Sequence, residues 1–560
     1  MAYQPPLAEY LFVLDHVVGF AAVRASSAGA GLDAETAAAI LTEAGRLAAE
    51  EIAPLNPVGD ANPARMEAGR LHSSPGFAEG HRAIAAGGWI GMAARPESGG
   101  LGLPMALATP VNEMLSAACL ALQLNIVLTQ GQIEALEHHA SPELAALVLP
   151  KLTSGLWSGT MNLTEPQAGS DVGALTSRAE RNADGTYAVT GQKIYITWGD
   201  CEFVENVCHL VLARLPDGPA GTKGISLFLV PKFLIDADGR PGTRNRLSVV
   251  SLEHKMGLHG SPTAVMSYDG ATGWLVGEPH RGMACMFTMM NNARLGVAAQ
   301  GVGVAEAALQ AALAHAANRH QGGRAIIAHP DVQRMLATMQ AEVFTARAIV
   351  LACAVATDLA KGGDDPVWQA RAALLTPIAK VFGTETGCKV ADLCIQVHGG
   401  AGFIEATGVA QYLRDVRITA IYEGTNGIQG IDLSLRKMAD GGVAAMSQID
   451  EIAFAARAAK QFPALAAPIQ DAAEALRVAT LALLALDTDD RLAAASAYLA
   501  AFGTVLGAHF HLLAAEADPA RAPLAAFAIM RLLPRHAALL AEVEPGAASL
   551  AAVFAGRGAL

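Results

Sequence analysis

The chain has 560 residues, of which 52% are hydrophobic and 16% are charged, and its formal net charge is −13. A chain of this length divides into several domains, and this apolar fraction is enough to bury a large core, which argues against disorder. The negative charge argues against nucleic acid or an anionic membrane as the main partner, because either would require a positive field.

Residues 1–155 are predicted to form an N-terminal helical domain. Apolar residues recur at intervals of three and four from Leu32, and we expect this helical stretch to stop at Pro54 and Pro57. A glycine-rich loop at residues 87–104 interrupts the helical pattern, which then resumes. The N-terminus lacks the basic-then-apolar order of a signal peptide, and the seven scattered cysteines fit thiols in a reducing compartment, so we expect a cytoplasmic protein.

Residues 156–278 are predicted to form an antiparallel β-domain, because short β-branched and aromatic runs alternate there with turn signals such as "NADGT" and "PDGPAG". After the first run, Thr164, Gly169 and Ser170 lie in a turn whose amides and hydroxyls could hold polar ring edges or a phosphate. An ordinary connection between strands explains that turn more simply. Tyr195 and Thr197 could flank a planar ring, although a half-buried strand accounts for them equally well.

Residues 279–440 are predicted to be a helical bundle, and residues 441–560 a helical extension. Helices, then strands, then helices indicate an α+β fold with segregated domains, which weighs against a nicotinamide-binding Rossmann domain. Residues 492–515 carry no formal charge and could span a bilayer by length. Their high alanine content and their polar residues favour a helix buried in a bundle, so contact with a membrane is not expected.

Two further segments combine glycines with polar residues. Gln396, Gly399 and Gly400 allow close approach of a ligand or another subunit, or they form a helix C-cap. Glu423 begins the run "EGTNG", where Thr425 or Asn426 can cap a helix starting near Gly427. By itself, Glu423 is more simply interpreted as a capping carboxylate. The paired histidines lack metal-ligand spacing, and no metal site is expected.

Together these segments resemble one known family. "LTEPQAGSDV", "KIYIT", "HKMGLHGSPTA", "QVHGGAGF", "LRDVRI" and "IYEGT" occur in the order and approximate spacing of the acyl-CoA dehydrogenase family. The resemblance runs from about residue 35 to 440. In its length at both ends, the chain is similar to a long bacterial branch that includes 3-methylthiopropionyl-CoA dehydrogenases.

The resemblance implies a helical domain, an antiparallel β-domain and a four-helix bundle around FAD, in a homodimer or homotetramer. It implies oxidation of an acyl-CoA, such as 3-methylthiopropionyl-CoA or another short or medium acyl-CoA, to the trans-2-enoyl-CoA. This is a reaction of fatty acid β-oxidation, and the electrons are expected to pass to an electron-transfer flavoprotein. An acyl-CoA oxidase that uses oxygen, and a non-catalytic binding or assembly member of the family, are the alternatives.

Glu423 matches the catalytic base of the family. Some relatives take their base from another helix, as a glutamate before the arginine that corresponds to Arg294, but Ala293 stands there in this chain. The expected substrate contacts are Ser170, Arg294, Tyr422 and Gly424. The expected FAD contacts are Met161, Leu163, Thr164, Gly169, Ser170, Tyr195, Thr197, Arg319, Gln321, Gln396, Gly399, Gly400 and Thr425. Of these, Arg319 and Gln321 are expected to reach the FAD of the other subunit.

Overall fold

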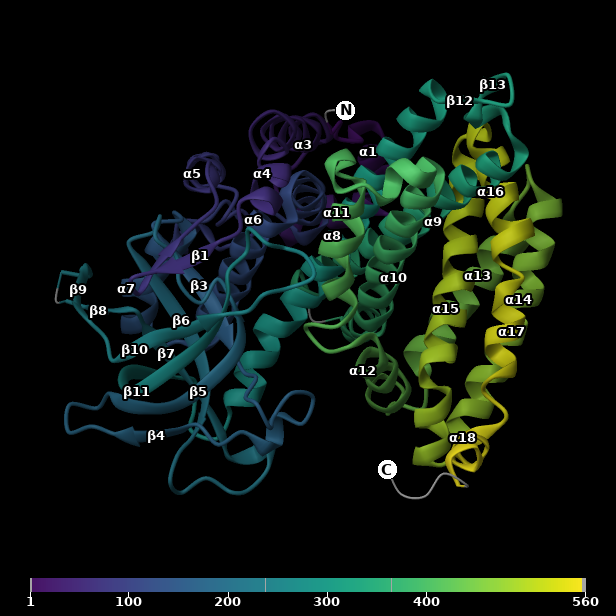
Figure 1. Cartoon of the computed structure of the whole chain (residues 1–560). Helices are drawn as coiled ribbons and strands as arrows, with labels where there is room; N and C mark the ends of the chain where they lie inside the picture. Colours follow the sequence, from purple (N-terminus) through teal and green to yellow (C-terminus); the bar gives the residue numbers. More distant parts are fainter. Residues whose placement is uncertain (1–2, 237, 364, 556–560) are drawn as a thin grey trace.

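The computed structural model describes residues 3–236, 238–363 and 365–555. Helices, then strands, then helices follow one another along the chain, so the predicted α+β class with segregated layers is confirmed (Figure 1). The strands between residues 157 and 276 lie on one side of the molecule, and most of the later helices, with the two short strands of residues 320–325, lie on the other side.

The N-terminal region is helical, with one small hairpin. Pro57 lies inside a helix, contrary to the expectation that the chain stops being helical at the two prolines. It is the third residue of α4, where its missing N–H removes no intrahelical bond. The elements are α1 (Leu7–His16), α2 (Phe20–Ala25), α3 (Ala34–Leu47), α4 (Leu55–Ala61), β1 (Arg65–Glu67), β2 (Arg70–His72), α5 (Phe77–Ala86), α6 (Met105–His139) and α7 (Pro142–Thr153).

A seven-stranded sheet forms the middle region, in the order β10-β11-β5-β4-β6-β3, with β7 pairing with β11 and β6. The strands are β3 (Trp157–Asn162), β4 (Arg178–Arg181), β5 (Tyr187–Thr197), β6 (Asn206–Arg214), β7 (Ile225–Pro231), β10 (Leu247–Leu252) and β11 (Thr263–Val276), and β8 (Phe233–Ile235) and β9 (Pro241–Arg244) form a separate pair.

The sheet differs in one respect from the antiparallel domain that was predicted. β3 runs parallel to β6, with Trp157 opposite Asn206, while most other pairs are antiparallel. A parallel pair needs a long crossover connection, and the chain between the two strands, which includes the hairpin β4–β5, supplies it. The sequence pattern of each strand carries no information about its direction.

The helices after the sheet include two long, closely packed helices, α8 (Gly282–Asn318) and α10 (Pro366–His398). A Cβ on Gly301 would lie 2.1 Å from the carbonyl oxygen of Gly383, so the two backbones touch there. The other elements are β12 (His320–Gln321), β13 (Arg324–Ala325), α9 (Pro330–Lys361), α11 (Val409–Val416), α12 (Asn426–Ile431), α13 (Val443–Ala458), α14 (Pro463–Ala485), α15 (Thr488–Ala517), α16 (Ala522–Phe527), α17 (Arg535–Ala541) and α18 (Gly546–Phe554).

Five helical segments in the described ranges are long and apolar enough to cross a membrane by length and composition. The most apolar windows of α6, α8, α9 and α15 are between 78% and 100% buried inside the protein. The window in residues 519–541 is 28% buried. The uncharged stretch of residues 492–515 therefore lies within α15 and packs inside the helical extension.

Candidate active site

Glu423 lies in a strained turn immediately before α12. Its φ is +56°, and that of the following Gly424 is +86°, so two consecutive residues are left-handed. The left-handed region is costly for a residue with a side chain, and residues held in it cluster at functional sites. A Cβ on Gly424 would lie 2.8 Å from the side-chain nitrogen of Gln429, so glycine is required at this position.

Side chains from neighbouring elements hold this turn in place. The carbonyl oxygen of Glu423 accepts hydrogen bonds from Nε2 of Gln429, at 3.3 Å, and from Nε of Arg294, at 3.5 Å. The hydroxyl of Thr425 accepts from the N–H of Ile428, at 3.2 Å, and caps α12 as expected. The backbone strain at Glu423 is therefore offset by contacts on both sides of it.

The carboxyl group of Glu423 is half-buried and chemically unusual. Burial raises its pKa to about 7, and the positive charges of Arg294 and Lys380 partly oppose that rise. A carboxylate with a pKa near the working pH is both ionised and basic enough to take a proton. Such a shift, combined with a strained backbone, is typical of a functional site.

Two groups of buried side chains surround the turn. Nζ of Lys380, on α10, donates to Oδ1 of Asn426, the first residue of α12, at 2.8 Å. On the other side, the hydroxyl of Tyr422 donates to the side-chain oxygen of Gln300 on α8. The amide nitrogen of Gln300 then donates to Oε1 of Gln123 on α6, at 2.7 Å. Three helices thus converge on the segment that carries Glu423.

The β-domain brings a second group of predicted residues together. Nζ of the fully buried Lys193 donates to the carbonyl oxygen of Leu163, at 3.0 Å, and to Oε1 of Glu165, at 2.8 Å. The carbonyl oxygen of Thr164 accepts from the N–H of Ile194, at 3.0 Å. The turn after β3 is therefore tied to the end of β5, next to Tyr195. Within that turn Gly169 and Ser170 are exposed, and Met161 lies half-buried in β3.

Tyr195 is exposed, with 61% of its surface accessible, and its φ is +61°. A tyrosine that is left-handed and points out of a sheet is a second strained residue at this site. Thr197 follows on β5 and pairs with Thr263 of β11. The aromatic ring and the neighbouring polar turn form an open surface suited to a flat polar ligand.

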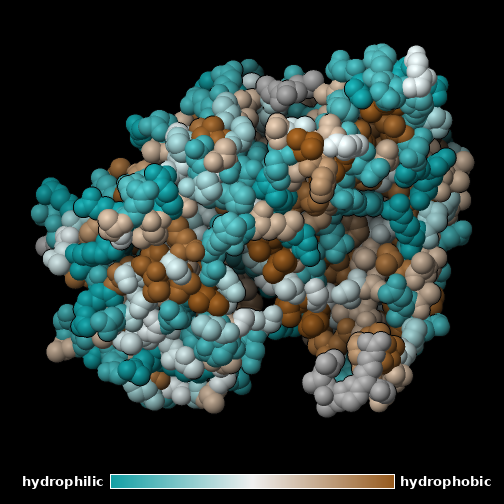
Figure 2. Space-filling model, in the orientation of Figure 1, coloured by the Kyte–Doolittle hydropathy of each residue, from teal (hydrophilic) through white to brown (hydrophobic). Residues whose placement is uncertain are grey.

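The molecule is hollowed between the β-domain and the C-terminal helices. Figure 2 shows a deep notch there, and in the same view of Figure 1 the sheet and α12 lie on its two sides. The two groups of residues described above belong to these two sides.

The remaining predicted residues lie far from Glu423. Arg319 and Gln321 are exposed beyond the C-terminal end of α8, and Gln396, Gly399 and Gly400 are exposed at the end of α10. The rings of His315 and His398 stack at 4.1 Å and join these two helix ends. Along α8, Arg319 is roughly 37 Å from Arg294 at 1.5 Å per residue. One chain therefore does not bring the two sets of residues into a single site.

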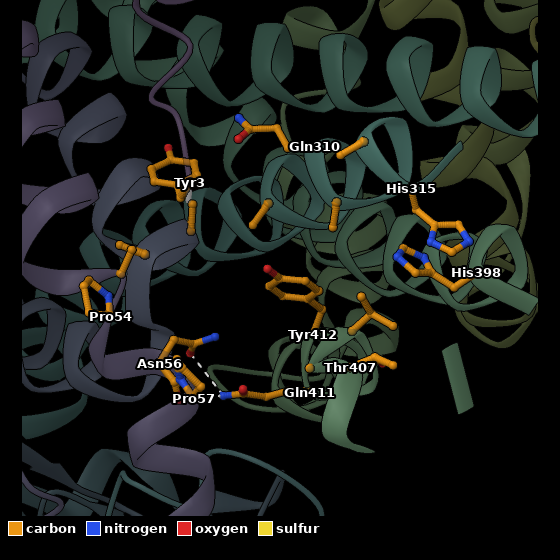
Figure 3. Close-up of a pocket in the computed structure, with 18 of the residues that line it drawn as sticks. Tyr3, Pro54, Asn56, Pro57, Gln310, His315, His398, Thr407, Gln411 and Tyr412 are labelled. Atoms are coloured by element: carbon orange, nitrogen blue, oxygen red, sulfur yellow. Dashed lines mark hydrogen bonds between the residues drawn. The ribbon is translucent and has the colours of Figure 1, made fainter. Parts of the chain in front are cut away.

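A cavity of about 650 Å³ lies elsewhere, between the N-terminal helices and the ends of α8 and α11 (Figure 3). Small apolar residues line most of it, and His315 and His398 lie at one end, while Gln411 bonds to Asn56 at its floor. None of the predicted site residues is among the residues that line it.

Several residues at the site were missed by sequence reasoning, chiefly Lys380, Gln429 and Gln300. Lys380 had a detectable signal, because it is the one charge in the apolar run "AALLTPIAKVF". The two glutamines had none, since amide side chains are common on helices and their partners are distant in sequence. No group of three or more His, Cys, Asp or Glu side chains in the described part of the chain could hold a metal ion.

Comparison with known proteins gives consistent matches along the chain. Sequence models of the acyl-CoA dehydrogenase N-terminal, middle and C-terminal domains match residues 34–156, 160–271 and 280–437. The chain is 45% identical over 455 residues to the 3-methylmercaptopropionyl-CoA dehydrogenase of Ruegeria pomeroyi, which covers 79% of this chain and 77% of that protein.

Solved structures agree with this match. ACDH-11 of Caenorhabditis elegans in complex with C11-CoA superimposes with a TM-score of 0.81 at 19% identity, over 100% of this chain and 97% of that one. A chain from work on the electron-transferring flavoprotein of Acidaminococcus fermentans gives a TM-score of 0.61 at 26% identity, over 72% of this chain and 98% of that one.

Proposed function

Because the chain belongs to the acyl-CoA dehydrogenase family, we propose that Glu423 is the base that removes the α-proton of its acyl-CoA substrate. The protein is an FAD-dependent oxidoreductase that converts an acyl-CoA thioester to the trans-2-enoyl-CoA, a reaction of fatty acid β-oxidation. The observation that carries the proposal is the half-buried carboxyl group of Glu423, with its pKa raised to about 7, in a clamped left-handed turn.

The chemistry explains why the base needs this environment. The α-proton of a thioester is far less acidic than a carboxylic acid, so an ordinary solvated carboxylate is too weak a base. Withdrawal of Glu423 from water strengthens it. Fixed N–H donors beside the thioester carbonyl lower the barrier further, because charge develops on that oxygen. The turn exposes backbone N–H groups without a side chain at Gly424, and Arg294 and Gln429 keep its geometry constant.

The residues present fit FAD. The side-chain oxygen of Gln429 is buried beside the Glu423 turn and has no hydrogen-bond partner among the described residues, so it can accept from water or a bound ligand. On the β-domain, Tyr195 presents an exposed ring in a strained conformation next to the polar turn of Thr164. Met161, Leu163, Thr164, Gly169, Ser170, Tyr195, Thr197 and Thr425 would hold the flavin end. When bound, FAD accepts the two electrons that leave the substrate.

For the substrate we propose 3-methylthiopropionyl-CoA or another short or medium acyl-CoA. The support is the similarity to the Ruegeria pomeroyi enzyme, whose name states that it acts on the first of these. The test is bleaching of the flavin absorbance by saturated acyl-CoAs of increasing length and by 3-methylthiopropionyl-CoA, under anaerobic conditions. We expect the fastest bleaching with the short thioether substrate, and faster bleaching by long linear chains would contradict this assignment.

The role of Glu423 is tested with Glu423→Gln. This variant keeps the size and one hydrogen-bond acceptor of the side chain but cannot take a proton. We expect normal FAD content and a fall in turnover of roughly 10²–10⁴-fold or more. Turnover within a few-fold of the wild type would disprove the role.

We propose a dimer in which each subunit completes the other's FAD site. Arg319, Gln321, Gln396, Gly399 and Gly400 are exposed at the ends of α8 and α10, and Arg319 is roughly 37 Å from Arg294 along α8, too far to serve the same flavin within one chain. A dimer, or a dimer of dimers, would bring this set to the partner's flavin. Light scattering should give at least twice the chain mass, and Arg319→Ala should lower FAD affinity. A fully FAD-loaded monomer would refute the proposal.

As electron acceptor we propose an electron-transfer flavoprotein. The similarity to a chain from work on such a system supports this choice, and fast oxidation of the reduced enzyme by oxygen would favour the oxidase alternative.

We also propose a cytoplasmic location, since all seven cysteines are free thiols, as expected in a reducing compartment. Cell fractionation would test that location.

A further inference from the structure

Lys380 is a buried lysine without an ion pair among the described residues. Its side chain is 0% exposed, and its one hydrogen bond in this part of the chain is the 2.8 Å contact from Nζ to Oδ1 of Asn426. An ammonium group has three N–H donors, and burying it without full compensation costs free energy. A fold that retains such a group at the active site calls for a reason beyond packing.

The hydrogen bond ties α10 to the segment that carries Glu423. Asn426 is the first residue of α12, three positions after Glu423. Besides accepting from Lys380, it donates through Nδ2 to the hydroxyl of Thr384, at 3.2 Å, and to Oε1 of Glu385, at 3.3 Å. Since Lys380, Thr384 and Glu385 all lie on α10, that helix fixes where the Glu423 turn ends.

The ammonium group also faces the carboxylate of Glu423. Two positive charges act on Glu423, Arg294 from α8 and Lys380 from α10. Nη1 of Arg294 lies 3.4 Å from Oδ2 of the buried Asp432, so another carboxylate already balances its charge. Lys380 has no such partner among the described residues. It is therefore the less neutralised of the two charges that favour the ionised form of Glu423.

The other groups around Lys380 leave this assignment intact. It faces Glu423, Arg294, Glu385 and Cys388. Burial raises the pKa of both Glu385 and Cys388, which weakens each as a competing negative charge. Burial also lowers the pKa of Lys380 to about 7, with the negative charge of Glu423 opposing that fall. The charge of each group thus stabilises the charged form of the other.

We propose that Lys380 is a positioning residue for the reaction: its ammonium group anchors Asn426 at the start of α12 and stabilises the ionised, proton-accepting form of Glu423. The proton from the substrate goes to Glu423, and Lys380 neither gains nor loses one in that step. This inference rests on the proposed role of Glu423, which Glu423→Gln tests separately.

Three substitutions separate charge from hydrogen bonding. Lys380→Arg keeps the charge and an N–H donor, Lys380→Gln keeps a donor without charge, and Lys380→Met removes both. The matched control is Lys389→Gln on the same helix, since Lys389 is 39% exposed and pairs with Glu342 of α9. The measurement is kcat/KM of each FAD-loaded enzyme between about pH 5.5 and 9.5, because its pH dependence reports groups of the free enzyme.

Because the pKa values of Glu423 and Lys380 are both about 7, we expect the wild-type kcat/KM to show a midpoint near pH 7 that belongs to the coupled pair. In Lys380→Gln the midpoint should move up by about one or more in pH, as expected when a nearby positive charge is lost. Lys380→Arg should restore the midpoint, and Lys389→Gln should leave it unchanged. Lys380→Met should show the same shift together with a lower plateau.

An unchanged midpoint in Lys380→Gln, with normal FAD content and unfolding temperature, would overturn the proposal. An equal shift in Lys389→Gln would overturn it as well, because the effect would then come from overall charge. Should Lys380→Met fail to fold, the comparison of the Gln and Arg variants still decides. High activity of Glu423→Gln would instead disprove the role of Glu423 on which this inference rests.

Discussion

At the scale of single residues, the site depends on side chains held in unfavourable states. Glu423 and Tyr195 both have positive φ values, and Glu423 is also withdrawn from water. Hydrogen bonds from neighbouring side chains hold the backbone in these conformations. Arg294 and Gln429 donate to the carbonyl oxygen of Glu423, and Lys193 donates to the carbonyl oxygen of Leu163 in the turn next to Tyr195. Stability is given up locally at both positions.

The raised pKa of Glu423 predicts how the free energy of unfolding depends on pH. The pKa of Glu423 is about 7 in the folded protein against an ordinary value of 4.5, so the folded state binds the proton more tightly than the unfolded state. The stabilisation from that proton is full at low pH and is lost as pH rises through about 7. Relative to the wild type, Glu423→Gln should therefore be more stable at pH 8.5 than at pH 5.5, by about 2 kcal/mol.

Urea unfolding of both proteins at the two pH values, with excess FAD, measures this difference. A difference in stability that is the same at pH 5.5 and pH 8.5 would show that Glu423 is not strained by burial of its charge.

The identity of these residues could be predicted better than their surroundings. Glu423 is selected by the resemblance of "IYEGT" to a family motif, and Thr164 and Ser170 by that of "LTEPQAGSDV", because each motif is local in sequence. The partners Lys380 and Gln300 come from other helices, and only the three-dimensional packing of α8 against α10 brings them to the turn. Long-range hydrogen bonds leave no periodic trace in a sequence.

At the scale of elements, helices could be predicted more reliably than the sheet. The apolar spacing that predicts helices is set within each segment, and long helices are observed in the predicted bundle of residues 279–440. The parallel pairing of β3 with β6 could not be predicted, since strand direction depends on the connection and not on the strand. The small hairpins β1–β2 and β12–β13 are too short to show any alternation.

One contact between elements joins the two ends of the chain. Arg521, just before α16, makes a bidentate pair with Glu9 of α1, at 2.9 and 2.7 Å, and lies over the ring of Phe12 at 3.6 Å. Both charged groups are about three-quarters covered. We expect Arg521→Ala to lower the free energy of unfolding by about 1–3 kcal/mol.

The control for this prediction is Arg334→Ala, whose pair with Asp331 is 50% and 74% exposed and should contribute less than about 0.5 kcal/mol. Equal effects of the two substitutions in urea unfolding would show that α1 is not held by this contact.

At the scale of the whole molecule, the helical extension supports the catalytic region. α15 packs against three elements that carry or support the site, since Gly503 meets Phe382 of α10, Gly507 meets Thr345 of α9, and Gly430 of α12 meets Ala495. The sequence predicts helices here, but not which surface they cover, because their apolar faces are similar.

Deletion of residues 445–560 should therefore give insoluble protein or a monomer without FAD. Removal of α15 would expose apolar faces of α9 and α10 and leave α12 without cover. Solubility, light scattering and flavin absorbance after expression measure the outcome. A soluble, FAD-loaded and active dimer would show that the extension serves another purpose.

The central claim is that Glu423 takes the proton from C2 of the acyl-CoA, and isotope exchange tests it most directly. The FAD-loaded wild type and Glu423→Gln are each incubated anaerobically in D₂O with a saturated acyl-CoA, which is then recovered and analysed by mass spectrometry. We predict deuterium at C2 with the wild type and none above background with the variant. Exchange at C2 by Glu423→Gln at the wild-type rate would contradict the account.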